Sequence, residues 1–472
     1  MTRGGAVILD VGKTNAKLTL WDADGRLVAR RGRANDRAAG PGYRALDAEG
    51  LEAWMGPVLR EFAALGDIRA IVPVAHGAAA ALVHDGALFA APMDYEDAGG
   101  EAERAAYAAQ RDRFAATGSP RLPQGLNLGF QLHRLEQMLG PWPDGLTILP
   151  WPQYWAWRLS GVIASEPTSL GCHSDLWRPF EAGPSALART RGWAERLGPL
   201  RHAADVLGPI SPEWAQRTGL PADCLVHAGL HDSNAAFLAA RSHAETAAAD
   251  TTVLSTGTWF VAMRSPDAGT AIPVLGPAHE GRDCLVNVDV EGRPAPSARF
   301  MGGREAELIA GSMLEGLMAP QSPAALAAAI PRVVASGAQI LPSFAPGVGP
   351  FPDRAGRWRG APPEAAADQA AALGLYLALV ADEMLDLIGS RDRLLIEGPF
   401  AEAAAMVRAL ATLRPDQAVF VSNRPDQVSL GALRLIRPDL RPPGPLSRIE
   451  PLDVPLDAYR ETWRAAIRGR AS

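Results

Sequence analysis

The pattern of hydrophobic and polar residues at the start of the chain predicts a series of strands and a helix. Residues 7–9 are apolar throughout and end at Asp10, whereas residues 17–21 alternate between polar and apolar side chains. The first pattern is typical of a buried strand and the second of a half-buried one. Asp24-Gly25 predicts a hairpin turn. The predicted elements are therefore, in order, strands 7–9, 17–21 and 27–29, a helix over 51–65 and a strand over 68–74.

A comparable order returns in the second half. Residues 252–254 predict a strand, Ser255 to Thr258 a turn, and residues 259–263 a second extended segment. Strands and helices then alternate, with helices over 369–388, 401–413 and from 429, and strands over 393–396 and 418–421. This alternation predicts an α/β protein with two lobes of similar design. Residues 241–250 lose apolar content, so we expect domains over 1–244 and 245–472.

Composition narrows the class of protein. The 472 residues are 47% hydrophobic and 21% charged, which is typical of a globular chain of two or three domains. The formal net charge of −6 comes without an arginine-rich run, so we expect neither nucleic acid nor an anionic membrane as partner. The apolar run over 373–381 is too short to span a bilayer. Three scattered cysteines and the lack of an export signal favour a reducing cytoplasm.

Lysine is almost absent, and its two positions coincide with a motif. The chain has 46 basic residues, of which only Lys13 and Lys17 are lysines. The segment Asp10-Val-Gly-Lys-Thr-Asn-Ala-Lys17 is not a P-loop, because Val7 stands where the first glycine should be and a strand follows. A tight hairpin can instead aim backbone N–H groups, Thr14, Asn15 and a lysine at an anion, while Asp10 can hold a metal ion. An ordinary hairpin with surface lysines is the alternative.

The second lobe carries two glycine turns. Thr256-Gly257-Thr258 lies where the first lobe has its hairpin. Two such hairpins can clamp a polyphosphate from opposite sides, as an ATP site between lobes requires. Gly398-Pro399-Phe400 connects a strand to a helix and permits close approach to a planar ligand, although a plain turn explains it equally well.

Asp232 is the candidate catalytic carboxylate. It stands among small residues in Gly229-Leu-His-Asp-Ser-Asn-Ala235, where it would be held rigidly, and capping a helix is the simpler alternative. His227 and His231 are four residues apart, but Ala228 replaces the acidic residue of a zinc motif, so we interpret both as structural.

Taken in order, these segments resemble the FGGY family of carbohydrate kinases, in the actin, hexokinase and Hsp70-like superfamily. The first phosphate motif resembles residues 10–17, the catalytic motif Gly-x-x-Asp-x-x-Ala resembles residues 229–235, and the second phosphate motif resembles residues 255–259. The Gly-x-Thr-Asn form is closest in style to L-fuculokinase and rhamnulokinase. Residues 395–401 and 429–432 fall where the adenosine motif lies, but Gly398-Pro399-Phe400 departs from the family's glycine-rich turn.

The resemblance implies two RNase H-like domains flanking a cleft: an N-terminal sugar-binding domain over 1–244 and a C-terminal nucleotide-binding domain over 245–472. It implies an ATP-dependent kinase acting on a primary hydroxyl of a ketose, with Asp232 as base and Asp10 and Asp232 at Mg²⁺. Sugar contacts are expected from His76, Gly77, Asp94 and Asp232. Nucleotide contacts are expected from Asp10, Gly12, Lys13, Thr14, Asn15, Lys17, Thr256, Gly257, Thr258, Gly398, Pro399 and Phe400.

Several alternatives stay open. The acceptor is L-fuculose or L-rhamnulose in the first interpretation and a pentulose in the second. A relative that binds nucleotide without phosphorylating sugar, such as an ATPase or a sugar sensor, is a different class, and so is a metal-dependent hydrolase using His227, His231 and Asp232. A homodimer is a further expectation, because dimers are the commonest assembly of enzymes.

Overall fold

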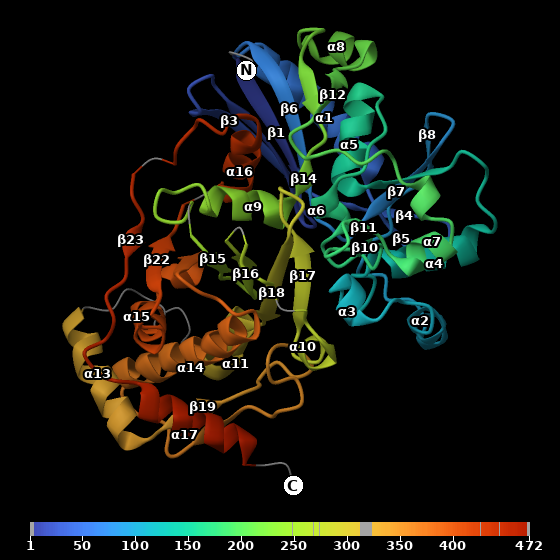
Figure 1. The fold of residues 1–472 in the computed structure, drawn as a ribbon. Coiled ribbons are helices and arrows are strands. Elements are labelled where there is room, and N and C mark those ends of the chain that lie inside the picture. The colour runs from blue at the N-terminus through green and yellow to red at the C-terminus, as the bar shows by residue number, and fades with distance from the viewer. Residues whose placement is uncertain are drawn as a thin grey trace. The chain divides into compact units, whose positions relative to one another are not determined.

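The computed structural model describes residues 4–247, 249–267, 269–272, 274–311, 323–424, 426–442 and 444–469. The chain forms two compact units. The first comprises residues 1–240, 286–294 and 426–442, and the second comprises residues 241–285, 295–425 and 443–472. Figure 1 shows the elements of both.

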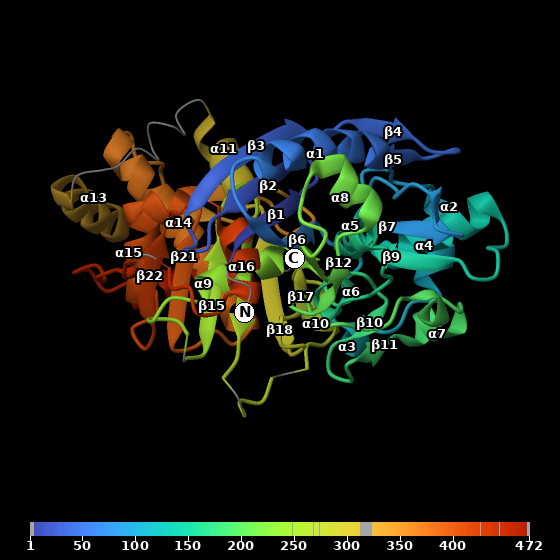
Figure 2. The same ribbon diagram turned by 90° about the horizontal axis from the view of Figure 1, so that it is seen from above.

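The first unit is built on a mixed sheet. Its order is β12-β13-β6-β1-β2-β3, and β14 also pairs with β6. Strands β1, β2 and β3 are antiparallel, whereas β6 runs parallel to β1. These three strands run next to one another in Figure 2. The strands are β1 (Gly5–Val11), β2 (Asn15–Trp21), β3 (Leu27–Ala34), β6 (Ile68–Ala75), β12 (Val206–Pro209), β13 (Leu225–His227) and β14 (Leu230–His231).

Helices cover both faces of this sheet, which explains why residues 6–9 of β1 are all apolar. Val7 and Leu9 pack into the core with α1 (Ala48–Ala63) and α5 (Trp151–Ser160). Ile8 packs on the opposite face, in the core that holds residues of α9 (Asp232–Ala240) and α16 (Gln427–Ile436).

Smaller elements complete the first unit. Its other strands are β4 (Arg37–Ala39), β5 (Arg44–Leu46), β7 (Ala80–His84), β8 (Ala87–Ala90), β9 (Thr147–Pro150), β10 (Trp177–Arg178) and β11 (Gly183–Pro184). Its other helices are α2 (Glu101–Ala108), α3 (Phe114–Thr117), α4 (Leu128–Leu139), α6 (Pro167–Leu170), α7 (Ala186–Thr190), η1 (Ala194–Arg196) and α8 (Pro212–Thr218).

The second unit repeats the same central order. Its sheet runs β17-β18-β16-β15-β21-β22-β23, with β15 antiparallel to β16 and parallel to β21, and the last three residues of β17, 286–288, are grouped with the first unit. Strand β15 therefore corresponds to β1, β16 to β2 and β21 to β6. The strands are β15 (Thr251–Ser255), β16 (Phe260–Ser265), β17 (Cys284–Val288), β18 (Pro294–Phe300), β19 (Gln339–Leu341), β20 (Arg357–Arg359), β21 (Arg393–Glu397), β22 (Ala418–Ser422) and β23 (Ser447–Arg448). The helices are α10 (Pro277–Glu280), α11 (Gly302–Ala310), α13 (Pro323–Ser336), α14 (Ala366–Leu387), η3 (Pro399–Glu402), α15 (Ala404–Leu413) and α17 (Asp457–Arg468).

The α/β class expected from the sequence is confirmed by these two sheets. The predicted boundary at residue 245 lies four residues after the division between Ala240 and Arg241. Two later segments, 286–294 and 426–442, group with the first unit, which the boundary prediction did not foresee. Both segments pack against parts of the first unit that are far away in sequence, and local sequence patterns cannot predict such contacts.

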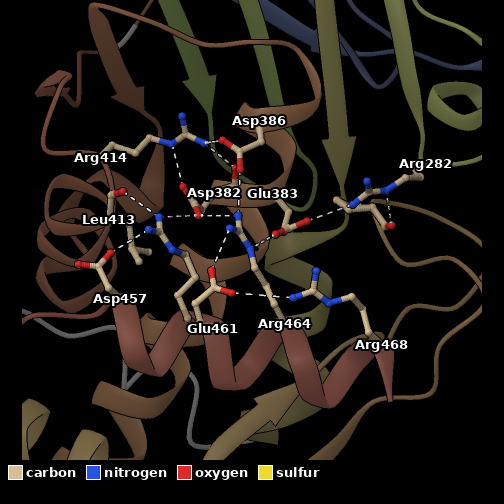
Figure 3. Close-up of polar contacts among 12 residues, drawn as sticks. Arg282, Asp382, Glu383, Asp386, Leu413, Arg414, Asp457, Glu461, Arg464 and Arg468 are labelled. Carbon is tan, nitrogen blue, oxygen red and sulfur yellow. Dashed lines mark hydrogen bonds and ion pairs between the residues drawn. The ribbon is translucent and has the colours of Figure 1, made fainter. Parts of the chain in front are cut away.

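Ion pairs anchor helix α17 in the second unit (Figure 3). Asp382 of α14 is 2% exposed and pairs with Arg414, Arg460 and Arg464 at 3.0 to 3.5 Å. A hollow of about 670 Å³ lies beside this network and is lined by residues of α14, α17 and the segments around 281 and 350–354. None of the predicted site residues lines it.

No helix within the described ranges is long and apolar enough to cross a membrane.

Candidate active site

Three strands of the first unit end at the same level. Val11 of β1 and His231 of β14 both pair with Ala75, the last residue of β6. These strands run parallel, so their carboxyl ends meet at one edge of the sheet, where ligands of α/β proteins usually bind. Asp10, His76 and Asp232 lie at or directly after these ends. The fold thus brings three of the predicted site residues to one edge.

Asp10 is the most perturbed carboxylate at this edge. It is 8% exposed, and burial, together with the negative charge of Asp232, raises its pKa to about 7. Lys17 acts in the opposite direction, and its effect is the smallest of the three. Two carboxylates that repel one another this way would both be stabilised by a cation between them.

The donor set fits Mg²⁺ better than zinc. In the part of the chain that the structure describes, no group of three or more His, Cys, Asp and Glu side chains is placed to hold a metal ion. Mg²⁺ keeps several of its waters and needs only one or two carboxylates together with substrate phosphates. Asp10 and Asp232 are carboxylates that would fit such a donor set. His227 Nδ1 contacts the carbonyl oxygen of Ala204 at 2.8 Å.

Asp232 opens α9, and its orientation is fixed locally. Its Oδ1 accepts hydrogen bonds from the backbone N–H and the hydroxyl of Ser233, at 2.6 and 3.2 Å. His231 Nε2 lies 3.3 Å from the same oxygen, and burial lowers the pKa of His231. The helix-capping interpretation and the catalytic one are compatible here, since Asp232 is the first residue of α9 and is half-buried.

A buried glutamate, to which the sequence analysis assigned no role in the site, positions the backbone before Asp232. Glu166 accepts hydrogen bonds from the Thr168 hydroxyl and from Ser169, and burial raises its pKa to about 7. Thr168 in turn accepts the N–H of His231 at 3.1 Å. An acidic helix cap followed by two hydroxyl residues is the sequence signal that could have revealed this chain of contacts.

Two further predicted residues, Lys13 and Asp94, meet in this unit. Lys13 Nζ forms an ion pair with Asp94 Oδ1, and it also lies 4.8 Å from the centre of the Tyr95 ring. The same ring packs edge-on against His76. The prediction that Lys13 neutralises phosphate stays a prediction, but its ammonium already has a carboxylate partner.

His76 and Gly77 form a buried turn after β6. Burial lowers the pKa of His76 to about 4, so its imidazole is neutral near pH 7. A side chain at Gly77 would collide with Cys172 Sγ and with the ring of His231, at 2.5 and 3.0 Å. Cys172 is buried with a pKa raised to about 12, which leaves it without thiolate character at neutral pH.

The hairpin between β1 and β2 presents its polar side chains to solvent. Thr14, Asn15 and Lys17 are exposed, and Gly12 is half-buried. Asn35, a residue that the sequence analysis did not select, closes the turn. Its side chain donates to the Gly12 carbonyl oxygen at 2.7 Å, and its N–H donates to the Thr14 carbonyl oxygen at 2.8 Å.

The corresponding turn of the second unit is buried instead. The N–H and the hydroxyl of Thr256 both donate to the carbonyl oxygen of Glu397, at 2.8 and 2.5 Å. The Thr256 hydroxyl also accepts the N–H of Phe400 at 3.1 Å. Gly257 and Thr258 follow, half-buried and exposed respectively. The turn after β15 is thereby joined to the turn after β21.

Two glycines allow this close approach. A Cβ at Gly398, which has φ of +89°, would lie 2.1 Å from the carbonyl oxygen of Thr256. A Cβ at Gly303 would lie 2.2 Å from the carbonyl oxygen of Gly257. Phe400 turns inward onto Phe260, with ring centres 4.9 Å apart, whereas Pro399 is exposed. The predicted turn of Gly398, Pro399 and Phe400 therefore begins a short 3-10 helix, η3.

Comparison with known proteins identifies the class. Residues 248–443 match the family model described as "Carbohydrate kinase FGGY, C-terminal domain". The chain is 51% identical to a carbohydrate kinase from Novosphingobium aromaticivorans, over 98% of this chain and 100% of that one, with a TM-score of 0.92. No curated protein matches the sequence.

More distant structures share the fold. A xylulose kinase from Rhodospirillum rubrum has 19% identity and a TM-score of 0.76, covering 98% of this chain and 97% of that one. The glycerol kinase of Plasmodium falciparum, solved with ADP, has 12% identity and a TM-score of 0.75, covering 99% and 98%. Fold and sequence together define an ATP-dependent sugar kinase. The chain belongs to the FGGY family of carbohydrate kinases.

Proposed function

We propose that this kinase transfers the γ-phosphate of ATP to a primary hydroxyl of a ketose, with Asp232 as the general base. The observation that carries the proposal is the convergence of Asp232, Asp10 and His76 at the carboxyl edge of one sheet. L-fuculose or L-rhamnulose is the first candidate acceptor, because the Gly-x-Thr-Asn hairpin resembles kinases of those sugars. A pentulose is the second.

In this mechanism, Asp232 accepts the proton of the sugar hydroxyl as its oxygen attacks the γ-phosphorus. Ser233 holds Asp232 Oδ1 and so fixes the direction in which the carboxylate faces. Glu166 and Thr168 fix the backbone at His231, one residue earlier. A base held by its neighbours in this way needs little reorganisation during the reaction.

Asp10 and Asp232 would hold Mg²⁺, which supplies neutralising charge to the phosphates. The raised pKa of Asp10 supports this role, since a cation would return the carboxylate to its ionised form. Thr14, Asn15 and Lys17, all exposed on the hairpin, would contact phosphate oxygens.

The second unit would bind the nucleotide through its backbone. Gly257 and Thr258 offer N–H groups on a turn that Thr256 holds rigid. The backbone of Gly398, Pro399 and Phe400 would lie against the adenosine, whereas the Phe400 ring packs inward on Phe260. The departure of this turn from a glycine-rich one leaves nucleotide preference as a property to measure.

The test is coupled ADP production with Mg-ATP over a panel of ketoses, polyols and aldoses. We expect turnover with a ketose, and a loss of at least about a thousandfold in kcat for Asp232→Asn with ATP binding retained. Asp85→Asn is the matched control, because Asp85 is an exposed residue at positive φ where asparagine is well tolerated. Normal turnover by Asp232→Asn would refute the base assignment.

The same assay separates the alternatives. Hydrolysis of ATP at an equal rate with and without sugar would favour an ATPase, and ATP binding without turnover on any sugar would favour a sensor. A cytoplasmic location remains part of the proposal, and the three buried free cysteines are compatible with a reducing compartment.

A further inference from the structure

The side chain of Lys13 is more buried than phosphate binding on this hairpin would require. Its side chain is 14% exposed, whereas Lys17, four residues later, is exposed on the hairpin. The Lys13 ammonium pairs with Asp94 and lies over the Tyr95 ring. One of the two lysines in the chain therefore lies among the predicted sugar contacts, and the other remains with the predicted phosphate contacts.

The two carboxylate oxygens of Asp94 differ in their hydrogen bonding. The side chain is fully buried, and Oδ1 accepts hydrogen bonds from Lys13 and from the N–H of Glu96. Oδ2 is also buried and has no hydrogen-bond partner among the described residues, although Arg37 Nε lies 3.7 Å away. A buried carboxylate oxygen without a donor is costly, so a ligand donor would stabilise it.

His76 adds a second incomplete group beside the first. Both ring nitrogens are buried, and neither has a hydrogen-bond partner within the described ranges. The ring contacts Tyr95, the residue that also lies under Lys13. A neutral imidazole offers one donor and one acceptor, and a sugar hydroxyl can serve either.

We propose that Lys13 and Asp94 form a charge-neutralised pair that sets the sugar specificity of this kinase. The inference rests on the proposed function and deepens it. Asp94 Oδ2 accepts a hydrogen bond from one hydroxyl of the acceptor, and His76 binds a neighbouring hydroxyl. The site thereby selects a neutral polyhydroxyl compound and rejects sugar acids, because the ammonium is committed to Asp94 and Asp94 Oδ2, which can only accept a hydrogen bond, offers a substrate carboxylate no donor.

Steady-state kinetics distinguish this role from phosphate binding. Lys13→Met removes the ammonium but keeps much of the stem, and we expect the KM for the ketose to rise at least tenfold while the KM for ATP changes less than twofold. Lys17→Met is the matched variant, for which we expect the KM for ATP to rise at least tenfold while the KM for the ketose changes less than twofold. A rise in the KM for ATP with Lys13→Met, and no rise in that for sugar, would overturn the inference.

Substrate discrimination provides the second measurement. The probes are L-rhamnulose, L-fuculose, D-xylulose and D-ribulose, with D-gluconate as the sugar acid. We expect wild-type kcat/KM to favour the best ketose over D-gluconate at least a hundredfold. Asp94→Asn removes the carboxylate partner of the Lys13 ammonium, which can then pair with the carboxylate of D-gluconate, and should narrow that ratio at least tenfold. A wild-type preference for D-gluconate, or an unchanged ratio in Asp94→Asn, would contradict the proposal.

Amine labelling gives a readout that does not depend on turnover. Since the chain has two lysines, limited acetylation followed by mass spectrometry reports each separately. We expect Lys13 to react more slowly than Lys17, and Asp94→Asn to raise the Lys13 rate at least threefold. Equal Lys13 rates in the two proteins would show that the pair does not form in solution. Absence of kinase activity on every sugar would count against the proposed function, whereas these labelling rates test the pair itself.

Discussion

The turns after β1 and β15 stand at equivalent places in two sheets of the same central order, but they are stabilised differently. The first turn presents exposed side chains and is closed by the side chain of Asn35. The second is held by buried contacts of Thr256 and by the N–H of Gly303, which donates to Gly257. A shared topology thus places a turn without determining which atoms hold it or face a ligand.

The largest expected effect comes from the glycines. Gly398→Ala would force a Cβ to within 2.1 Å of Thr256 at positive φ, and we expect it to lower the free energy of unfolding by about 3 kcal/mol. Gly12→Ala is the matched change in the first unit, where the Cβ would meet only the Asn15 carbonyl oxygen, at 3.1 Å. Its effect should be within about 1 kcal/mol. Denaturant unfolding measures both, and equal losses would contradict the contrast.

The second effect tests a property that the units share. Burial raises the pKa of Glu166 and of Glu397 to about 7, one in each unit. The folded protein therefore holds these protons more tightly than the unfolded chain. Their stabilising contribution is present below about pH 4.5 and is lost as the pH rises through about 7, by at most about 3 kcal/mol for each group.

Glu166→Gln should flatten the pH dependence of stability between pH 5 and 8, measured by urea unfolding at several pH values. Glu397→Gln is the counterpart in the second unit. If the pH dependence of stability stays as steep in both variants as in the wild type, neither carboxyl binds its proton more tightly in the folded protein than in the unfolded chain.

A smaller difference is expected between the two threonines. Thr256→Val keeps the shape but removes a hydroxyl that both donates and accepts, so we expect a loss of about 2 kcal/mol. Thr14→Val removes an exposed hydroxyl that accepts a hydrogen bond from the Asn15 side chain, and stability should change by less than about 0.5 kcal/mol. Thermal unfolding compares them, and a larger loss for Thr14→Val would reverse the contrast.

The smallest effect concerns the residue that closes the first turn. Asn35→Ala removes the hydrogen bond to Gly12 and should cost about 1 kcal/mol. In the second unit the corresponding side-chain contacts are those of the Thr256 hydroxyl, so Thr256→Val is the counterpart of this change there. Asn423→Ala removes an exposed hydrogen bond to Glu402 and serves as the control, and a loss as large as that of Asn35→Ala would show that the effect is not specific to the turn.

Local patterns predicted much of the fold. The strands expected over 7–9 and 17–21 are Gly5–Val11 and Asn15–Trp21, and the helix expected over 369–388 is Ala366–Leu387. Segments 286–294 and 426–442 could not be assigned to the first unit, because their packing partners lie far away in sequence. For the candidate site, the motifs selected Asp10, His76 and Asp232, but not Glu166 or Asn35.

The missed residues share a physical reason. Asn35 acts on the Gly12 carbonyl group, and Glu166 acts on His231 only through Thr168, so both roles depend on contacts between segments that are far apart in sequence. The local pattern could indicate a helix cap at Glu166 but not its link to His231. Lys13 illustrates the converse case. Its motif indicated phosphate, and only its position beside Asp94 and Tyr95 suggested another partner.

The contact between α9 and α16 has a consequence for biosynthesis. A Cβ at Gly431 of α16 would lie 1.7 Å from the Ala235 carbonyl oxygen, so the two helices meet backbone to backbone. Helix α16 leaves the ribosome long after residue 240, roughly ten to forty seconds later at ordinary rates of translation. During that interval Ile8 and Leu230 lack part of their cover. The N-terminal unit is thus completed nearly last, and a nascent chain that stops before α16 presents an unfinished apolar face to the chaperones of the cell.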